Sequence, residues 1–168
     1  IASCLVGSEM CIRDRQITDF TEWQDTTEGA WCYYRNETEY GVEYGKLYNW
    51  YAVNDARGFA PLGYHVPNND EWDSLFDTDS NAYAWKESGV THWNTDNGTD
   101  LYGFTGLGGG ERDIDTNFIN IKIKARFWSA DMYDDDLAYV SGIDNSSATL
   151  FGNKLDKNFG FSVRLVRD

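Results

Sequence analysis

The residue pattern of the chain changes near its middle, and this change limits the architectures that the chain can adopt. In the first half, apolar residues recur at helical spacing over about 45–54 and about 69–77. In the second half, glycines interrupt the chain every few residues, and Ile119, Ile121 and Ile123 alternate with polar residues as in a half-buried strand. Other short strands are predicted at 30–34, 137–143, 148–152 and 160–167. Two helices followed by a small antiparallel sheet with long loops predict an α+β domain.

The start of the second predicted helix carries the clearest local signal. Asn68 is followed three residues later by Glu71, which is the spacing of a capping box, and Asp70 adds a second acid to the first turn. Upstream, 16–29 is polar with isolated aromatic residues, and we expect an irregular lead-in there. Further on, a turn is predicted at 145–147, between two of the short strands.

Charge and length exclude several classes of protein. The 168 residues contain 14 Lys and Arg against 28 Asp and Glu, which gives a net charge of −14. Such a surface repels phosphate backbones and anionic lipid, so no nucleic-acid partner is expected. Aromatic residues make up 16% of the chain, which indicates a folded core rather than a disordered acidic segment. No apolar run approaches the roughly 18 residues of a membrane span, and the length suits one domain.

Residues 1–15 differ from the rest of the sequence. The stretch IASCLVGSEMCIRDR shows neither helical nor strand periodicity, and it resembles a translated sequencing adapter. We therefore expect a non-native or disordered tail over 1–15 and a single domain over 16–168. The tail holds two of the three cysteines, Cys4 and Cys11, so Cys32 is the one cysteine of the predicted domain.

Catalytic chemistry has few residues to use in this domain. A lone cysteine next to Trp31 and Tyr33 is more often a buried apolar residue than a nucleophile. His65 and His92 lie far apart in the sequence, and Cys–His chemistry or an iron site would need further partners. We interpret His65 as a structural residue at a strand-to-helix corner and His92 as a loop-packing residue. The sequence therefore predicts a protein that is not an enzyme and that needs no cofactor.

Several motifs occur in order along the chain. They are WCYY at 31–34, YGKLYNWYAV at 44–53, GYHVP at 63–67 with EW at 71–72, KESGVTHW at 86–93, a glycine-rich stretch at 103–112 and FSVRLVRD at 161–168. Together they resemble the Fibrobacter succinogenes major paralogous domain, and the resemblance extends from about Thr21 to Asp168.

The resemblance implies a C-type-lectin-like fold, in the branch that includes formylglycine-generating enzymes and the variable proteins of diversity-generating retroelements. In such a fold, two helices pack on a small antiparallel sheet, and long loops form the ligand face. Members are mostly secreted or attached to the bacterial cell envelope, so the same location is expected here. The resemblance also implies a tight structural turn at 108–110 and a structural ion pair for Arg112.

Two departures from the family pattern lead to expectations of their own. Ala60 and Leu165 stand where members often carry cysteines, and we expect core packing to replace a lost disulfide. The strand that usually begins the domain is absent, and residues 1–15 stand in its place. Because the first and last strands pair in lectin-like folds, we expect strand 160–167 to present an open edge.

Calcium is the metal for which the sequence offers candidate ligands. The proline-containing sugar-binding motifs of calcium-dependent lectins do not occur here. Asp96, Asn97 and Asp100 could supply hard oxygen ligands for Ca²⁺. An Asx-rich turn explains the same residues with fewer assumptions, and we favour that interpretation.

The segment 130–158 corresponds to the exposed binding face of the lectin-like variable proteins. It is rich in Asp, Asn, Ser and Tyr, which make adaptable hydrogen bonds and amphipathic contacts. We expect a non-catalytic binding or adhesion domain that recognises a protein or glycan at a cell surface through loops 130–158. The candidate contact residues are Asp131, Tyr133, Asp134, Asp135, Asp136, Tyr139, Asn145, Ser147, Asn153 and Asn158.

Other interpretations of the same residues stay open at this point. The polar side chains of 130–158 are also those of an ordinary solvated loop. The chain is also compatible with a structural module of a larger envelope protein that has no ligand of its own. A third possibility is a retroelement-diversified receptor domain, in which sibling copies differ at the Asn, Asp, Ser and Tyr positions of 130–158.

Overall fold

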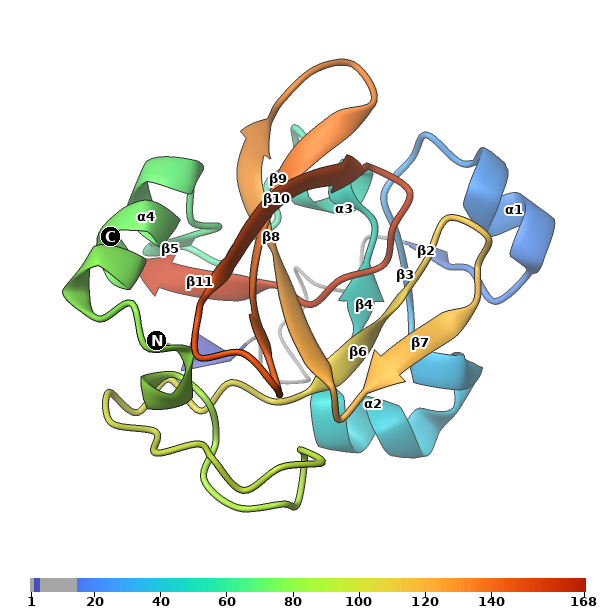
Figure 1. Cartoon of the computed structure of the whole chain (residues 1–168). Coiled ribbons are helices and arrows are strands. Elements are labelled where there is room, and N and C mark those ends of the chain that lie inside the picture. Colours follow the sequence, from blue (N-terminus) through green and yellow to red (C-terminus); the bar gives the residue numbers. More distant parts are fainter. Residues whose placement is uncertain (1, 4–14) are drawn as a thin grey trace.

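The computed structural model describes residues 2–3 and 15–168, and this part of the chain forms four α-helices and four small β-sheets (Figure 1). The helices are α1 (Phe20–Asp25), α2 (Thr38–Tyr44), α3 (Trp50–Val53) and α4 (Asn69–Thr78). The strands are β1 (Ala2–Ser3), β2 (Arg15–Gln16), β3 (Ala30–Cys32), β4 (Leu47–Tyr48), β5 (Tyr64–His65), β6 (Gly109–Arg112), β7 (Phe118–Ile121), β8 (Lys124–Met132), β9 (Leu137–Asp144), β10 (Phe151–Asp156) and β11 (Arg164–Arg167). The α+β class is confirmed, with four helices where two were expected. None of the described helices is long and apolar enough to cross a membrane.

Helix α4 begins where the sequence predicts it. The Asn68 side chain accepts a hydrogen bond from the Glu71 amide at 2.8 Å, and the Glu71 carboxylate accepts one from the Asn68 amide at 2.9 Å. This capping box satisfies an amide of the first turn that has no partner within the helix. Trp72 follows on the inner face of the helix and is buried.

The prediction of a single helix over 45–54 is wrong, because two local signals divide that stretch. Gly45 follows α2 with φ +82°, a left-handed conformation that glycine adopts without strain and that ends the helix. Strand β4 comes next. Asn49 then begins the separate helix α3, and its side-chain oxygen accepts a hydrogen bond from the Ala52 amide at 3.1 Å.

The irregular lead-in expected at 16–29 contains helix α1. The Asp19 carboxylate accepts a hydrogen bond from the Glu22 amide at 2.9 Å and so caps the helix. Trp23 is fully buried, and its indole Nε1 donates to the Asn158 carbonyl oxygen at 2.7 Å. A helix of six residues is unstable in water by itself, so this one depends on the burial of Trp23.

The second half of the chain forms an antiparallel sheet in the order β10–β9–β8. Strand β9 confirms the prediction at 137–143, and the turn after it lies at 145–146. The strand predicted at 148–152 instead occupies Phe151–Asp156. The alternating isoleucines do not form one strand, because the chain turns after β7 at Lys122, where φ is +58°, and continues as β8.

The open edge expected for the last strand is wrong. Strand β11 lies between β1 and β5, and Leu165 pairs with Ala2 while Val166 pairs with His65. Strand β1 has only two residues, but β11 is itself short, so this pairing covers part of its edge. Within the expected tail, residues 1 and 4–14 lie outside the described residues, so the expectation of disorder there stays a prediction.

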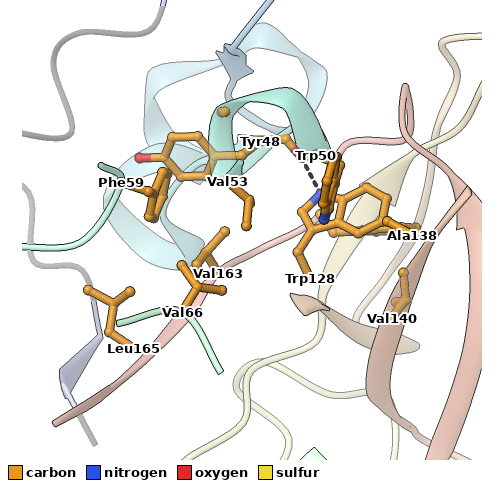
Figure 2. Close-up of a cluster of buried hydrophobic side chains, with 12 residues drawn as sticks. Tyr48, Trp50, Val53, Phe59, Val66, Trp128, Ala138, Val140, Val163 and Leu165 are labelled. Carbon is orange, nitrogen blue, oxygen red and sulfur yellow. Dashed lines mark hydrogen bonds between the residues drawn. The ribbon is translucent and has the colours of Figure 1, made fainter. Parts of the chain in front are cut away.

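A central cluster of buried side chains joins α3, the β10–β9–β8 sheet and β11 (Figure 2). Trp128 is fully buried in it, with its ring centre 4.7 Å from that of Phe161. The Trp128 Nε1 donates to the Tyr48 carbonyl oxygen at 2.7 Å, which ties the sheet to β4. Leu165 is buried in this cluster and Ala60 packs against it, so the core packing expected at both positions is present.

Two expectations for the glycine-rich stretch are also wrong. Gly109 and Gly110 open strand β6 instead of forming a tight turn. Gly110 has φ +68°, and a Cβ atom there would lie 2.7 Å from the Ile119 carbonyl oxygen, so glycine allows β6 and β7 to approach. Among the described residues Arg112 has no acidic partner for the expected ion pair; its guanidinium donates to the Ile17 carbonyl oxygen at 3.0 Å and lies 4.4 Å from the Trp23 ring centre.

Candidate functional site

The segment 130–158 is mostly β-sheet, so the expectation that loops make up its surface is wrong. It contains the end of β8, all of β9 and β10, and connections at 133–136 and 145–150. The two connections lie at opposite ends of the sheet, because Met132 pairs with Ala138 whereas Lys124 pairs with Asp144. The β8–β9 connection projects from the body of the molecule at the top of Figure 1. The candidate residues therefore fall into separate groups.

Asp134 organises the β8–β9 connection. Its Oδ1 accepts hydrogen bonds from the Asp136 amide at 3.0 Å and from the Leu137 amide at 2.8 Å. The Tyr133 amide donates to the Leu137 carbonyl oxygen at 2.8 Å and closes the turn. Asp135 and Asp136 remain exposed at the end of the turn. The side chain of Asp134 therefore shapes the turn, and its neighbours supply the exposed negative charge.

Lys157 lies beneath this turn and holds it from the inside. The residue is only 4% exposed, and its ammonium donates to the carbonyl oxygens of Asp134 and Asp135, both at 2.7 Å. The same ammonium lies 4.8 Å from the centre of the Trp50 ring. Charge-assisted hydrogen bonds of this kind are stronger than neutral ones. The acidic turn is thus fixed in one conformation by a buried positive charge.

Exposed Tyr133 and Lys154 form a cluster with half-buried Tyr139 beside the turn. The two tyrosine rings meet edge to face with their centres 5.7 Å apart. Lys154 pairs with Tyr139 between β10 and β9, and its ammonium lies 4.0 Å from the Tyr133 ring centre and 5.5 Å from that of Tyr139. Tyr133 is 50% exposed, and the adjacent Met132 is 54% exposed. We call Met132, Tyr133, Asp134, Asp135, Asp136, Tyr139 and Lys154 the tip surface.

Two of the candidate residues serve the fold. The Asp131 carboxylate accepts a hydrogen bond from the Asn69 amide at 2.8 Å and thereby links β8 to the first turn of α4. The side-chain amide of Asn158 donates to carbonyl oxygens of 23, 24 and 26 at 3.2, 2.9 and 2.9 Å. Asn158 therefore holds helix α1 in place, and its side chain has no donor left for a partner.

Three further candidates lie outside the tip surface. At the far end of the sheet, the Asn145 carbonyl oxygen accepts a hydrogen bond from the Thr95 hydroxyl at 2.9 Å, and the Ser147 hydroxyl accepts one from the Thr149 amide at 3.0 Å. Asn153 lies on β10, where its side chain accepts from the Lys154 amide at 2.8 Å. The structure does not bring these three residues together with Tyr133.

Sequence reasoning missed Met132, Lys154 and Lys157. The strand predicted at 148–152 ended before Lys154, so the pairing of this lysine with Tyr139 could not be deduced. Lys157 acts on backbone atoms of residues that lie 22 and 23 positions earlier in the chain. No local pattern indicates such a contact. Met132 follows Asp131 near the end of β8, where its exposure depends on the turn geometry.

The residues considered for calcium are engaged in hydrogen bonds within the domain. The Asn97 side-chain oxygen accepts a hydrogen bond from the buried Lys86 ammonium, which would repel a cation. Asp100 accepts from the Thr105 amide at 2.7 Å, and Asp96 accepts from the Gly89 amide at 3.1 Å. These contacts join residues that are 11, 5 and 7 positions apart, so they hold the loop together over a longer range than an Asx turn does. In the described part of the chain, no three His, Cys, Asp or Glu side chains gather as a metal site.

The thiol and the two imidazoles occupy structural positions. Burial raises the pKa of the Cys32 thiol to about 11, although Arg112 acts in the opposite direction, so little thiolate forms at neutral pH. Hydrogen bonds to Asp168 at 2.7 Å and to Glu71 at 2.8 Å raise the pKa of His65. His92 lies between Glu87, at 2.8 Å, and Glu43, at 3.3 Å.

The fold and the site thus define an α+β domain with an acidic turn that Lys157 holds from inside and that carries the exposed ring of Tyr133. The model of the Fibrobacter succinogenes major domain matches residues 9–167, and the chain belongs to this family. The match confirms the resemblance drawn from the sequence motifs, and it begins within the stretch that was expected to be a tail. No curated protein and no solved structure matches the chain.

Proposed function

We propose that this chain is a non-catalytic binding domain that recognises a protein partner at a cell surface through the tip surface. The observation that carries the proposal is the exposure of Met132 and Tyr133 on a turn that Lys157 fixes from inside. Exposed aromatic and methionine side chains are enriched at protein interfaces. The chain carries two negative charges for each positive one. On such a charged surface, Met132 and Tyr133 provide apolar area that a partner can bury.

The rigidity of the turn supports binding. A partner that meets a flexible loop must order that loop, and the ordering costs free energy. Here the Asp134 side chain and the Lys157 ammonium already occupy the backbone groups of the turn. The side chains of Tyr133 and Tyr139 also restrict each other by their edge-to-face contact. The cost of ordering this surface is therefore largely met in the free protein.

The charge of the tip surface indicates the kind of partner. Asp134, Asp135 and Asp136 supply three carboxylates, and Lys154 supplies one cation. A partner with a basic patch around an apolar centre complements this arrangement and is steered toward it over long distances. We therefore propose a basic protein surface as the partner.

Three further properties belong to this proposal. The fold is C-type-lectin-like, which the α+β class and the small antiparallel sheets support. The domain acts outside the cytoplasm, as the family resemblance implies, and fractionation of a host that expresses the intact gene tests this location. The absence of catalysis is supported by the burial of Cys32 and the ion pairs of both histidines.

A random peptide library displayed on yeast tests the proposed function. The purified domain should enrich peptides rich in Lys and Arg with an aromatic or aliphatic residue. Tyr133→Ala should lower the affinity for the enriched peptides at least about 10-fold, which is the effect expected of an interface residue that dominates binding. Val42→Ala is the matched control, because Val42 is 83% exposed on α2, at the opposite end of the molecule in Figure 1. Failure to enrich any peptide, or equal loss in both variants, contradicts the proposal.

A further inference from the structure

A groove lies between the β6–β7 hairpin and strand β10, on the opposite face of β10 from the tip surface. Phe151 and Leu155 line the groove, whereas Lys154 between them faces Tyr139, as alternation along a strand requires. The groove is open to solvent and has a volume of about 420 Å³. Ile114, Ile119 and Phe159 complete its apolar walls.

Two buried side chains of opposite charge form the polar part of the groove. Arg126 is 3% exposed and Glu111 is 7% exposed, and the Arg126 Nε lies 4.0 Å from the Glu111 Oε2. Within residues 2–3 and 15–168, the Arg126 Nη1 has only long hydrogen bonds of 3.4 Å, to the carbonyl oxygens of 125 and 143. Phe151 covers the guanidinium, with its ring centre 3.8 Å from the Arg126 Cζ. A guanidinium with such weak partners retains donors for a ligand.

Asn120 adds a third, independent feature. It has φ +63° within strand β7, a left-handed conformation that asparagine adopts more readily than most residues other than glycine. Its side-chain amide donates to the Glu111 Oε1 at 2.7 Å and so orients the carboxylate.

The charges of the lining select the chemistry of the ligand. Glu111, Asp113 and Asp115 are acidic, while Lys124 and Arg126 are basic, so the lining is close to neutral on a chain of net charge −14. An anion meets three carboxylates there and a cation meets two basic groups, so either is disfavoured. A sugar ring without charge suits the site, because its C–H face packs on apolar walls and its hydroxyls both donate and accept hydrogen bonds.

We propose that this groove binds a neutral sugar residue of a glycan. The site is independent of the tip surface, since the two lie on opposite faces of β10 and use different residues. Its affinity for one sugar should be weak, with a Kd on the order of 1–10 mM, because a single ring offers few contacts.

Nuclear magnetic resonance titration of the full chain tests the proposal. The probes are methyl α-mannopyranoside and methyl β-glucopyranoside, which are neutral, together with glucuronate as the anion and glucosamine as the cation. At least one neutral sugar should shift the amide signals of Ile119, Asn120 and Phe151 and leave those of Tyr133 and Tyr139 unchanged. Both charged sugars should bind at least about 3-fold more weakly than that neutral sugar.

Variants assign the binding to the groove. Asn120→Gly keeps the left-handed backbone and removes the amide that orients Glu111, and Lys124→Met removes a basic group of the lining. Each variant should lower the affinity for the neutral sugar at least about 3-fold. Arg167→Met removes one exposed cation of β11, outside the groove lining, and should leave the affinity for the sugar unchanged. Stronger binding of glucuronate or glucosamine, shifts confined to the tip surface, or no shift by either neutral sugar at about 50 mM would overturn the proposal.

Discussion

The ammonium of Lys157 donates a hydrogen bond of 2.7 Å to the carbonyl oxygen of Asp134, across 23 positions of the chain. A buried cation thereby supports a turn whose exposed residues are acidic. The contact joins the core beside Trp50 to the tip surface. Stability and recognition should therefore respond together when this lysine is changed.

Replacement of Lys157 by methionine tests that link. Lys157→Met retains the length of the side chain and leaves two carbonyl oxygens without their donor, so the free energy of unfolding should fall by about 1–3 kcal/mol. Urea denaturation measures it, and amide exchange at 134–137 should become faster. Lys154→Met is the control and should change stability by less than about 0.5 kcal/mol, because Lys154 is exposed. Equal effects of the two variants would refute the anchoring role of Lys157.

Asn49 should be among the most sensitive polar positions of the fold. The residue is fully buried, its Oδ1 accepts from the amides of Ala30 and Ala52, and its Nδ2 donates to the Glu28 carbonyl oxygen. Asn49→Ala removes these three hydrogen bonds and leaves the buried Ala30 amide without its acceptor, while the Ala52 amide keeps the Asn49 carbonyl oxygen at 3.2 Å, and it should cost about 2–5 kcal/mol. Asn68→Ala removes a cap that is exposed and should cost about 1 kcal/mol. Chemical denaturation of both variants checks the order, and a reversed order contradicts this view of the core.

The contacts of His65 predict a dependence of stability on pH. The pKa of His65 is raised, because Asp168 and Glu71 accept its hydrogen bonds. A raised pKa means that the folded state binds the proton more tightly than the unfolded state. The stabilisation is therefore present below about pH 6.5 and is lost as pH rises through the folded-state pKa. Because the side chain is 39% exposed, solvent screens the ion pairs and the effect should stay below about 1 kcal/mol.

Urea denaturation of the wild type and His65→Gln at about pH 6 and about pH 9 measures this effect. The stability advantage of the wild type should be larger at the lower pH, and added salt should reduce it. The pKa of Glu71 is lowered, so its own contribution is lost only in more acidic solution, below its ordinary pKa of 4.5. An advantage that grows toward pH 9 would show that the imidazole is not protonated in its pairs.

The thiol of Cys32 should be inert in the folded protein. In a variant with Cys4→Ser and Cys11→Ser, Cys32 is the remaining cysteine. Its burial and its pKa of about 11 predict labelling by a thiol reagent at least about 100-fold slower than in the unfolded chain. Absorbance on addition of an aromatic disulfide reagent follows the reaction. Rapid labelling under native conditions would reopen the question of cysteine chemistry.

Local signals could be deduced from the sequence, and contacts between distant segments could not. The capping box of Asn68 and Glu71 is local, so α4 was predicted almost to the residue. Gly45 divides the stretch 45–54, but the tyrosines on either side keep a helical spacing and conceal the division. Strand β11 acquires its neighbour from Ala2 and Ser3, which no pattern near residue 165 reveals.

The candidate site shows the same division between local and distant information. Tyr133, Tyr139 and the aspartates of 134–136 were named from composition and position, and the structure places them together on the tip surface. Asn158 was named for the same reasons, yet its amide is used by helix α1. Residue type alone does not separate an exposed asparagine from one that supports the fold. The groove lined by Arg126 and Glu111 joins strands that are distant in sequence, so it could not be predicted.

The central claim is that the tip surface recognises a basic partner. The most direct test is a nuclear magnetic resonance map of one library-selected basic peptide on the wild-type domain. The account predicts that the amide signals of 132–137, Tyr139 and Lys154 shift together as the peptide is added. It also predicts that Tyr133→Ala abolishes these shifts. Shifts centred on any other surface, with the signals of 132–137 unchanged, would contradict the account.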